Sequence, residues 1–293
     1  MRDGTERATR RYIELLGDAL LDEHYLENEL RIDELLGHAQ REGAPELHKL
    51  ANPVRYMSTA MRRLRWERDT GALPDDPAGT GGLAYAGLGR VRLEHLGSCL
   101  EELRAGSVAG DFVDCCTGRG GAAIFMRGFL EARELSEPRV WVADRFDGSG
   151  PRFAPDLNGV REAFARFRLL DERVMFLEGP PSRTLAEAAI GEIALLRIDS
   201  RGPEEIRSVL EALYPRVAPG GFVIVDGYGA PGCDAAVDEF RSAAAAGEQL
   251  ERVDWSAVTW RKAGASPNGA VHTTRPAATL DLSVVLVMYN MRR

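Results

Sequence analysis

Alternation of short apolar runs with amphipathic segments is the feature of this chain that most constrains its fold. From residue 111 onward the apolar runs are DFVDC, RVWVAD, RVMFLEG, EIALLRID and GGFVIVDGYG, and helical patterns separate them. Apolar strands joined by helical crossovers form a parallel sheet that is covered on both faces. Because such crossovers are right-handed, the sequence predicts an α/β fold with a doubly wound, mostly parallel sheet. The last segment, LERVDWSAVTWRK, could add a terminal hairpin.

The residues on either side of this alternating part have a different character. Residues 10 to 68 have the apolar periodicity of helices, and TGALPDDPAGTGG, from Thr70 to Gly82, reads as a connector or a lid. The segment after Lys262 is polar and rich in small residues, as linkers are. We therefore expect three parts: an N-terminal helical or lid region over 1–92, an α/β domain over 93–262, and a linker with one further strand over 263–293.

Composition narrows the class of protein. The chain has 293 residues and a formal net charge of −8, which argues against a general nucleic-acid binder because such a protein needs a basic face. Its four cysteines form no C-x-x-C pair, so we expect neither a disulfide framework nor a zinc site. The N-terminus has no apolar signal core, and no apolar run approaches the ~18 residues that span a bilayer. We expect a cytoplasmic protein that binds neither nucleic acid nor membrane.

Acidic residues stand at the ends of the predicted strands. In a doubly wound sheet, ligands bind beyond the carboxyl ends of the strands. A single acid at such a place is often only a helix cap or a solvated turn. A series of acids at successive strand ends is a stronger indication of a site. The acids in question are Asp114, Asp144, Glu178, Asp199 and Asp226.

A glycine-rich loop follows the first strand. It reads D-C-C-T-G-R-G-G, from Asp114 to Gly121, and Asp144 ends the next strand. An acid in that second place can accept both hydroxyls of a ribose, an arrangement used by dinucleotide enzymes and by S-adenosylmethionine enzymes. The loop lacks the G-x-G-x-x-G spacing, because its acid comes first and its glycines come late. The pattern therefore favours the methyltransferase version of the fold over the NAD version.

Six motifs in order make the resemblance specific. They are VAGDFVDCCTGRGGAAIFMRGFL, RVWVADRFDG, FRLLDERVMFLEGPPSRTL, LEALYPRVAPGGFVIVDGYG, AVDEFR and VDWSAVTWRK. Over roughly residues 10 to 262 the chain resembles the macrocin O-methyltransferases, which methylate sugar hydroxyls on macrolide and aminocoumarin antibiotics. The resemblance implies a class I, Rossmann-like methyltransferase, S-adenosylmethionine as cofactor and a small-molecule glycoside as substrate. Such a chain could also form a homo-oligomer.

The resemblance assigns a cofactor site. The ribose acid of the family falls on Asp144, and we add Gly179, at the end of the third strand. The family has glycine where Cys116 stands, and a Cβ atom there would crowd the approach of the backbone to the cofactor. The cofactor loop of the family falls on Asp114, Cys115, Cys116, Thr117, Gly118, Gly120 and Gly121.

The resemblance also implies a magnesium site, which this chain has altered. Family members hold the metal with a D-x-D stretch and a D-D-Y stretch, and these read DSR and DGY here. Asp199 and Asp226 match metal ligands, Gly227 replaces the third ligand, and Arg201 stands where the family has its general base. A guanidinium remains protonated and cannot act as a base, so the catalytic base is unassigned.

A fixed positive charge beside two carboxylates has a predictable effect. We expect Arg201 to form a salt bridge with Asp199 or Asp226, and magnesium binding to be weak or absent. Aspartate at positions 201 and 227 together should then raise metal affinity. The alternative function is a degenerate, catalytically impaired domain that binds cofactor or glycoside and is fused to a glycosyltransferase.

Two further interpretations concern the ends of the chain. The final run, LDLSVVLVMYNMRR, is similar to the opening strand of family-2 glycosyltransferases, although it could also be a last strand of the same sheet. In or beside the N-terminal helical region lie four histidines, which are more often packing or surface residues than bases. One of them could replace the missing base if a lid brings it over the site: His24, His38, His48 or His95.

Overall fold

The computed structural model describes residues 2–40, 47–70, 83–148, 156–244 and 246–263. The expected connector or lid runs from Thr70 to Gly82, and all of it after Thr70 lies outside the described residues. The glycosyltransferase-like strand near the end of the chain also lies outside them. Among the helices that the structure describes, none combines the length and the apolar character needed to cross a membrane.

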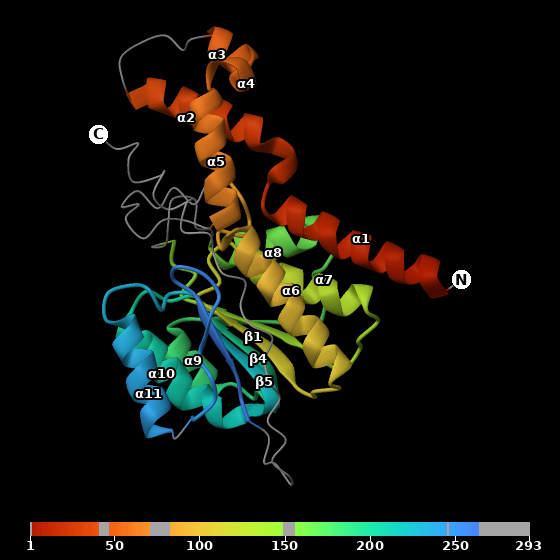
Figure 1. Ribbon diagram of the computed structural model, residues 1–293, viewed down its shortest axis with the longest axis vertical. Coiled ribbons are helices and arrows are strands. Elements are labelled where there is room, and N and C mark those ends of the chain that lie inside the picture. Colours follow the sequence, from red (N-terminus) through yellow and green to blue (C-terminus); the bar gives the residue numbers. More distant parts are fainter. Residues whose placement is uncertain (1, 41–46, 71–82, 149–155, 245, 264–293) are drawn as a thin grey trace.

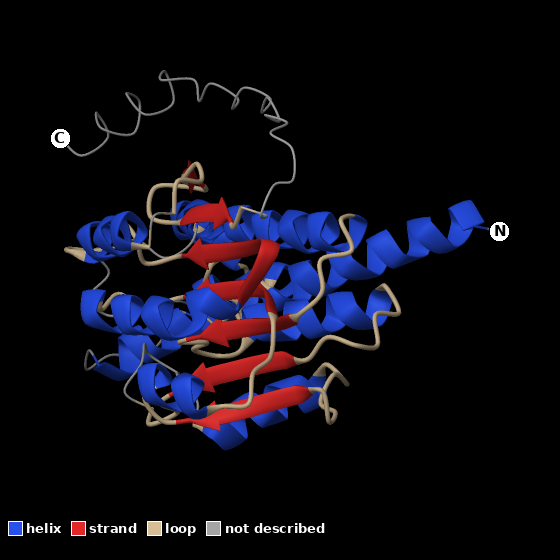
Figure 2. Cartoon of the chain, turned by 90° about the horizontal axis from the view of Figure 1, so that it is seen from below, coloured by secondary structure: helices blue, strands red, loops and turns tan. Residues whose placement is uncertain are grey.

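The described strands form one seven-stranded sheet with the order β3-β2-β1-β4-β5-β7-β6. Neighbours from β3 to β5 are parallel, whereas β7 is antiparallel to both β5 and β6. The predicted doubly wound, mostly parallel sheet and its terminal hairpin are therefore confirmed (Figure 2). The strands are β1 (Asp111–Cys115), β2 (Val140–Asp144), β3 (Val174–Glu178), β4 (Ile193–Ile198), β5 (Val217–Val225), β6 (Glu251–Arg252) and β7 (Val258–Arg261).

Helices cover both faces of this sheet (Figure 1). Successive strand residues point to opposite faces, so each strand contributes to two separate cores. On β1, for example, Phe112 packs into one core and Val113 into the other. The first core includes side chains of α1 (Arg2–Leu20), α6 (Gly89–Ala105), α7 (Gly121–Ala132) and α8 (Leu157–Arg166). The second includes side chains of α9 (Pro181–Glu187), α10 (Pro203–Leu213) and α11 (Cys233–Ala243).

The N-terminal helix α1 packs directly against the α/β core. Leu16 and Leu20 are buried in the core on the α7 side of the sheet. A Cβ atom at Gly128 of α7 would lie 2.2 Å from Leu16 Cδ2, so the absence of a side chain there permits the close approach. The division expected at residue 92 stays a prediction, and α6 runs through that point.

A smaller cluster lies farther from the sheet. Helices α2 (Leu26–Gln40) and α5 (Ser58–Thr70) bury Leu26, Leu30, Met61 and Leu64 against one another. The remaining short elements are η1 (Glu23–Tyr25), α3 (Leu47–Ala51), α4 (Pro53–Tyr56) and η2 (Tyr214–Arg216). In Figure 1, α5 runs from this outer cluster down to the carboxyl edge of the sheet, so it can carry part of a site there.

Candidate active site

The glycine-rich loop between β1 and α7 has the backbone of a ligand cradle. Cys116, Gly118 and Gly120 all adopt the left-handed region, with φ of 60°, 56° and 84°. A Cβ atom on Gly121 would lie 2.4 Å from the carbonyl oxygen of Tyr85, so this position requires glycine. The left-handed region costs a non-glycine residue roughly 1–2 kcal/mol, and Cys116 therefore stands in a strained position.

Two acids from neighbouring strand ends fix this loop. The Thr117 hydroxyl donates to Asp114 Oδ2 at 2.6 Å, and Gly118 N donates to Asp144 Oδ2 at 3.0 Å. Gly179 N donates to the main-chain oxygen of Asp144 at 3.0 Å. Burial raises the pKa of Asp144, although the hydrogen bonds from the amides of Gly118, Phe146 and Arg145 act in the opposite direction. The structure thus brings these five predicted cofactor-site residues together at one edge of the sheet.

The two adjacent cysteines have different environments. Cys115 is buried in the core, and its carbonyl oxygen accepts a hydrogen bond of 3.0 Å from Asp199 N, so its side chain does not face the loop. Cys116 is partly exposed, and its Sγ lies 3.5 Å from Glu205 Oε2. Burial raises the pKa of both thiols, which therefore remain protonated.

Arg197 joins the acids at the ends of three neighbouring strands. Its Nη1 lies 2.6 Å from Asp114 Oδ1, and its Nη2 lies 2.8 Å from Asp199 Oδ2 and 2.5 Å from Asp226 Oδ2. Burial alone would lower the pKa of Arg197, but the surrounding carboxylates raise it well above its usual range. The order of strands β1, β4 and β5 explains why one guanidinium reaches all three acids.

Asp199 is the accessible member of this acidic cluster. Its side chain keeps 37% of its surface exposed, against 0% for Asp114 and 1% for Asp226. The surrounding protein desolvates the carboxyl group and raises its pKa to about 6, although Arg197 acts in the opposite direction. Any ligand that reaches the cluster from solvent therefore meets Asp199 first.

The predicted salt bridge of Arg201 is wrong. Arg201 is exposed, and among the ion pairs of the described residues none joins it to Asp199 or Asp226. The partner is Arg197 of β4, and Asp199 directly follows the end of that strand, two residues after Arg197, so that the two side chains meet on one side of the sheet. The sequence contained a signal for this, because an arginine inside the apolar run EIALLRID needs buried counter-charges.

Position 227 has no room for a third carboxylate. A Cβ atom on Gly227 would lie 1.7 Å from the carbonyl oxygen of Ser200. This geometry is against the expectation that aspartate at positions 201 and 227 would rebuild a metal site. Within the described part of the chain, no three His, Cys, Asp or Glu side chains are grouped so that they could hold a metal ion.

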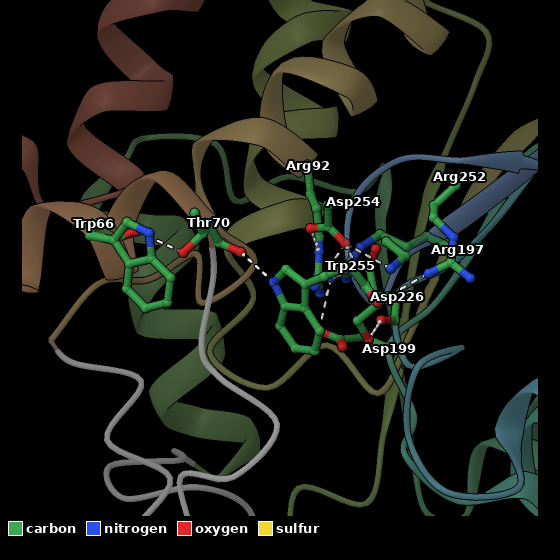
Figure 3. A network of polar contacts seen from close by, with 11 residues as sticks. Trp66, Thr70, Arg92, Arg197, Asp199, Asp226, Arg252, Asp254 and Trp255 are labelled. Atoms are coloured by element: carbon green, nitrogen blue, oxygen red, sulfur yellow. Dashed lines mark hydrogen bonds and ion pairs between the residues drawn. The ribbon is translucent and has the colours of Figure 1, made fainter. Parts of the chain in front are cut away.

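A second network, which sequence reasoning missed, connects the acidic cluster to the N-terminal helices (Figure 3). Arg92 of α6 contacts Asp254 Oδ2 at 2.6 Å, and its guanidinium lies 5.3 Å from the ring centroid of Trp255. Trp255 Nε1 donates to the Thr70 carbonyl at the end of α5, at 3.2 Å. The Ser256 hydroxyl donates to the main-chain oxygen of Asp226 at 2.8 Å. Trp255, which belongs to the predicted terminal hairpin, therefore also contacts α5.

Of the four candidate histidines, the structure describes the side chains of His24 and His95. His24 is exposed on η1, and His95 lies half-buried on α6 with its Nε2 3.4 Å from Cys99 Sγ. Burial lowers the pKa of His95. The side chains of His38 and His48 lie outside the described residues.

Comparison with known proteins decides the family. The family described as Macrocin-O-methyltransferase (TylF) matches residues 9–158 and 151–262. The chain belongs to the macrocin-O-methyltransferase family. The predicted family is therefore confirmed, together with the enzyme class of methyltransferase and, as the family implies, S-adenosylmethionine as the methyl donor.

Several known O-methyltransferases are similar to this chain. The 8-demethyl-8-(2,3-dimethoxy-alpha-L-rhamnosyl)-tetracenomycin-C 4'-O-methyltransferase of Streptomyces olivaceus is 36% identical over 63% of this chain and 78% of its own length. The demethyldecarbamoylnovobiocin O-methyltransferase of Streptomyces niveus is 37% identical over 61% of this chain and 76% of its length. The solved structure of the O-methyltransferase NovP is 30% identical, with a TM-score of 0.68, and covers 87% of this chain and 100% of that chain.

Proposed function

We propose that this chain transfers the methyl group of S-adenosylmethionine to a sugar hydroxyl of a glycosylated natural product. The similar proteins include enzymes named for O-methylation of a rhamnosyl-tetracenomycin, of a novobiocin precursor and of mycinamicin III at its 3'' position. The observation that carries the proposal is the loop from Asp114 to Gly121, which is tied to Asp144 by the Gly118 amide.

The loop and Asp144 have separate roles in holding the donor. Helix α7 begins at Gly121, directly after the loop, and its N-terminus favours negative charge such as that of the methionine carboxylate. The Asp144 carboxylate accepts the ribose hydroxyls while the Gly118 amide holds it in place. Bound in this way, the cofactor supplies an electrophilic methyl group at the carboxyl edge of the sheet.

The acceptor hydroxyl must lose a proton as it attacks the methyl group. Arg201 cannot take this proton, because a guanidinium stays protonated. Asp199 is the best-placed alternative, since it is the exposed carboxylate of the cluster and is held by Arg197 at 2.8 Å. The protein then contributes orientation of the hydroxyl and a proton acceptor, which are the two requirements of an in-line displacement.

Calorimetry with S-adenosylhomocysteine tests the cofactor part of this proposal. Wild-type protein should bind, and Asp144→Ala should lose about 1–3 kcal/mol of binding free energy because two ribose hydroxyls lose their acceptor. Asp156→Ala is a matched control, because Asp156 caps α8 by accepting from Gly159 N and lies outside the proposed site. Binding of NADH in place of S-adenosylhomocysteine would refute the proposal.

Methyl transfer to a panel of glycosides tests the rest. Product formation on a sugar hydroxyl, shown by mass spectrometry, is the expected result. Tight binding of S-adenosylhomocysteine without transfer to any acceptor would instead support the alternative function, a cofactor-binding domain without activity, which the arginine at position 201 favours. Homo-oligomer formation, a fused glycosyltransferase and a cytoplasmic location stay predictions.

A further inference from the structure

We propose that the acidic edge of this sheet functions without the divalent cation that the resemblance implies, because the protein itself occupies the third ligand position. The inference rests on the proposed function only for the location of the site. It concerns how the residues after β4 and β5 pack against each other, which the family assignment does not determine.

The contact between Gly227 and Ser200 is the first step. The Cβ position of residue 227 lies 1.7 Å from Ser200 O and 2.8 Å from the Ser200 carbonyl carbon. Real Cβ atoms do not approach backbone atoms this closely, so an aspartate at 227 requires the loop after β4 to move. The space that a third carboxylate would need is therefore filled by main chain.

The loop that fills this space is firmly held. Ser200 is 5% exposed, its hydroxyl donates to Glu205 Oε2 at 3.0 Å, and it accepts from Gly202 N at 3.1 Å. The flanking strand ends are fixed as well, since Asp226 N donates to the carbonyl oxygen of Ile198 at 3.0 Å. Moving Ser200 aside would break hydrogen bonds of a buried polar group, which is costly.

Glu205 connects two of the departures from the family pattern, those at positions 116 and 227. Its Oε2 accepts from the Ser200 hydroxyl at 3.0 Å and lies 3.5 Å from the thiol of Cys116. Cys116 replaces a glycine of the family, and Ser200 contacts Gly227, which replaces an aspartate. Positions 116 and 227 thus belong to one packed unit, and we expect that reversing either one alone does not reopen the site.

The two remaining carboxylates are also poorly disposed toward magnesium. Arg197 Nη2 lies within 2.8 Å of Asp199 Oδ2 and 2.5 Å of Asp226 Oδ2, so a positive charge is already present between them. Both carboxylate oxygens of Asp226 are closed to solvent. Magnesium demands six oxygens in an octahedron and usually retains several waters, which a closed carboxylate cannot accommodate. The cluster therefore obtains its counter-charge from the protein.

Metal binding by the wild-type protein is the direct test. Manganese, which prefers the same oxygen ligands as magnesium, can be titrated by electron paramagnetic resonance. We expect no one-to-one binding, and the dissociation constant of S-adenosylhomocysteine should change by less than about twofold between EDTA and excess magnesium. One-to-one manganese binding that Asp199→Asn abolishes would overturn the inference. Absence of S-adenosylhomocysteine binding would refute the proposed cofactor site and leave the manganese titration to decide the metal question.

Two variants at position 227 distinguish the steric effect of a side chain from the effect of its charge. Gly227→Ala introduces only the Cβ atom, whereas Gly227→Asp adds the carboxylate of the family. We expect both to lower the melting temperature by a similar amount, on the order of 5 °C, and neither to gain manganese binding. Gly227→Asp that binds manganese one-to-one would overturn the inference, and so would Gly227→Ala that melts at the wild-type temperature.

Discussion

Replacing Arg197 by methionine should destabilise this protein more than replacing almost any other arginine. Arg197 is 2% exposed and holds Asp114, Asp199 and Asp226 with its two terminal nitrogens. Methionine fills a similar volume but has no charge. The variant would leave three carboxylates around a site that has lost its cation.

The size of the effect follows from burial. Removing one partner of a buried ion pair costs about 3–5 kcal/mol, because the other charge stays desolvated and unpaired. Asp114 and Asp226 are buried, whereas Asp199 can turn toward solvent, so we expect about 4 kcal/mol in total rather than one full penalty for each acid. A total stability of 5–15 kcal/mol is usual for domains, so the variant should fold but with little reserve.

Urea unfolding at pH 7.5 measures this difference. Arg104→Met is the matched control, because Arg104 forms an exposed pair with Glu101 on α6 and should contribute at most about 1 kcal/mol. Arg197→Lys should lie between wild type and Arg197→Met, since lysine keeps the charge but cannot bind two acids with a planar fork.

The pH dependence of the difference provides a second check on the cause. Without Arg197, which lowers the pKa of Asp199, the folded-state pKa of Asp199 rises further above its unfolded value, so ionisation of this carboxyl destabilises the fold more at neutral pH. This destabilisation is relieved as pH falls through the folded pKa toward the unfolded one. In the wild type the pKa of Asp199 is already about 6. The difference in free energy of unfolding between variant and wild type should therefore narrow between pH 7.5 and pH 5. A loss below about 1 kcal/mol, or a gap that does not change with pH, would refute the reasoning.

Two other predictions concern the loop and the contact with α5. Cys116→Gly should leave the melting temperature nearly unchanged, because relief of the left-handed strain offsets the greater conformational entropy of glycine in the unfolded chain. Cys116→Val should lower the free energy of unfolding by more than about 1 kcal/mol. Equal melting temperatures for the two variants would contradict this prediction. Trp255→Phe removes the hydrogen bond from Nε1 to Thr70 O, and it should raise KM for the acceptor while leaving S-adenosylhomocysteine affinity unchanged in calorimetry. A change in cofactor affinity with an unchanged KM for the acceptor would contradict this prediction.

Much of the fold could be predicted from sequence because it depends on local patterns. Apolar runs of strand length recur between amphipathic helices, and each predicted strand from DFVDC to the terminal hairpin is present in the sheet. The glycine loop was predictable for a similar reason. Left-handed backbone at Gly118 and Gly120 favours glycine as a local property of the turn, whereas position 121 requires glycine because the Tyr85 carbonyl oxygen approaches it closely.

The electrostatics of the site depend instead on which strand ends become neighbours. Asp114, Asp199 and Asp226 are separated along the chain and meet only because β4 lies between β1 and β5. Reading along the chain assigned the counter-charge to Arg201, since that residue replaces an acid of the family. The direction of the Arg197 side chain is set by β4, where Arg197 pairs in register with Asp114 of β1, while Arg201 lies three residues past the end of the strand, where direction is no longer fixed. A charged residue in an apolar strand is thus better evidence for an ion pair than a substitution in a loop, because the strand determines its direction and burial requires it to have a partner.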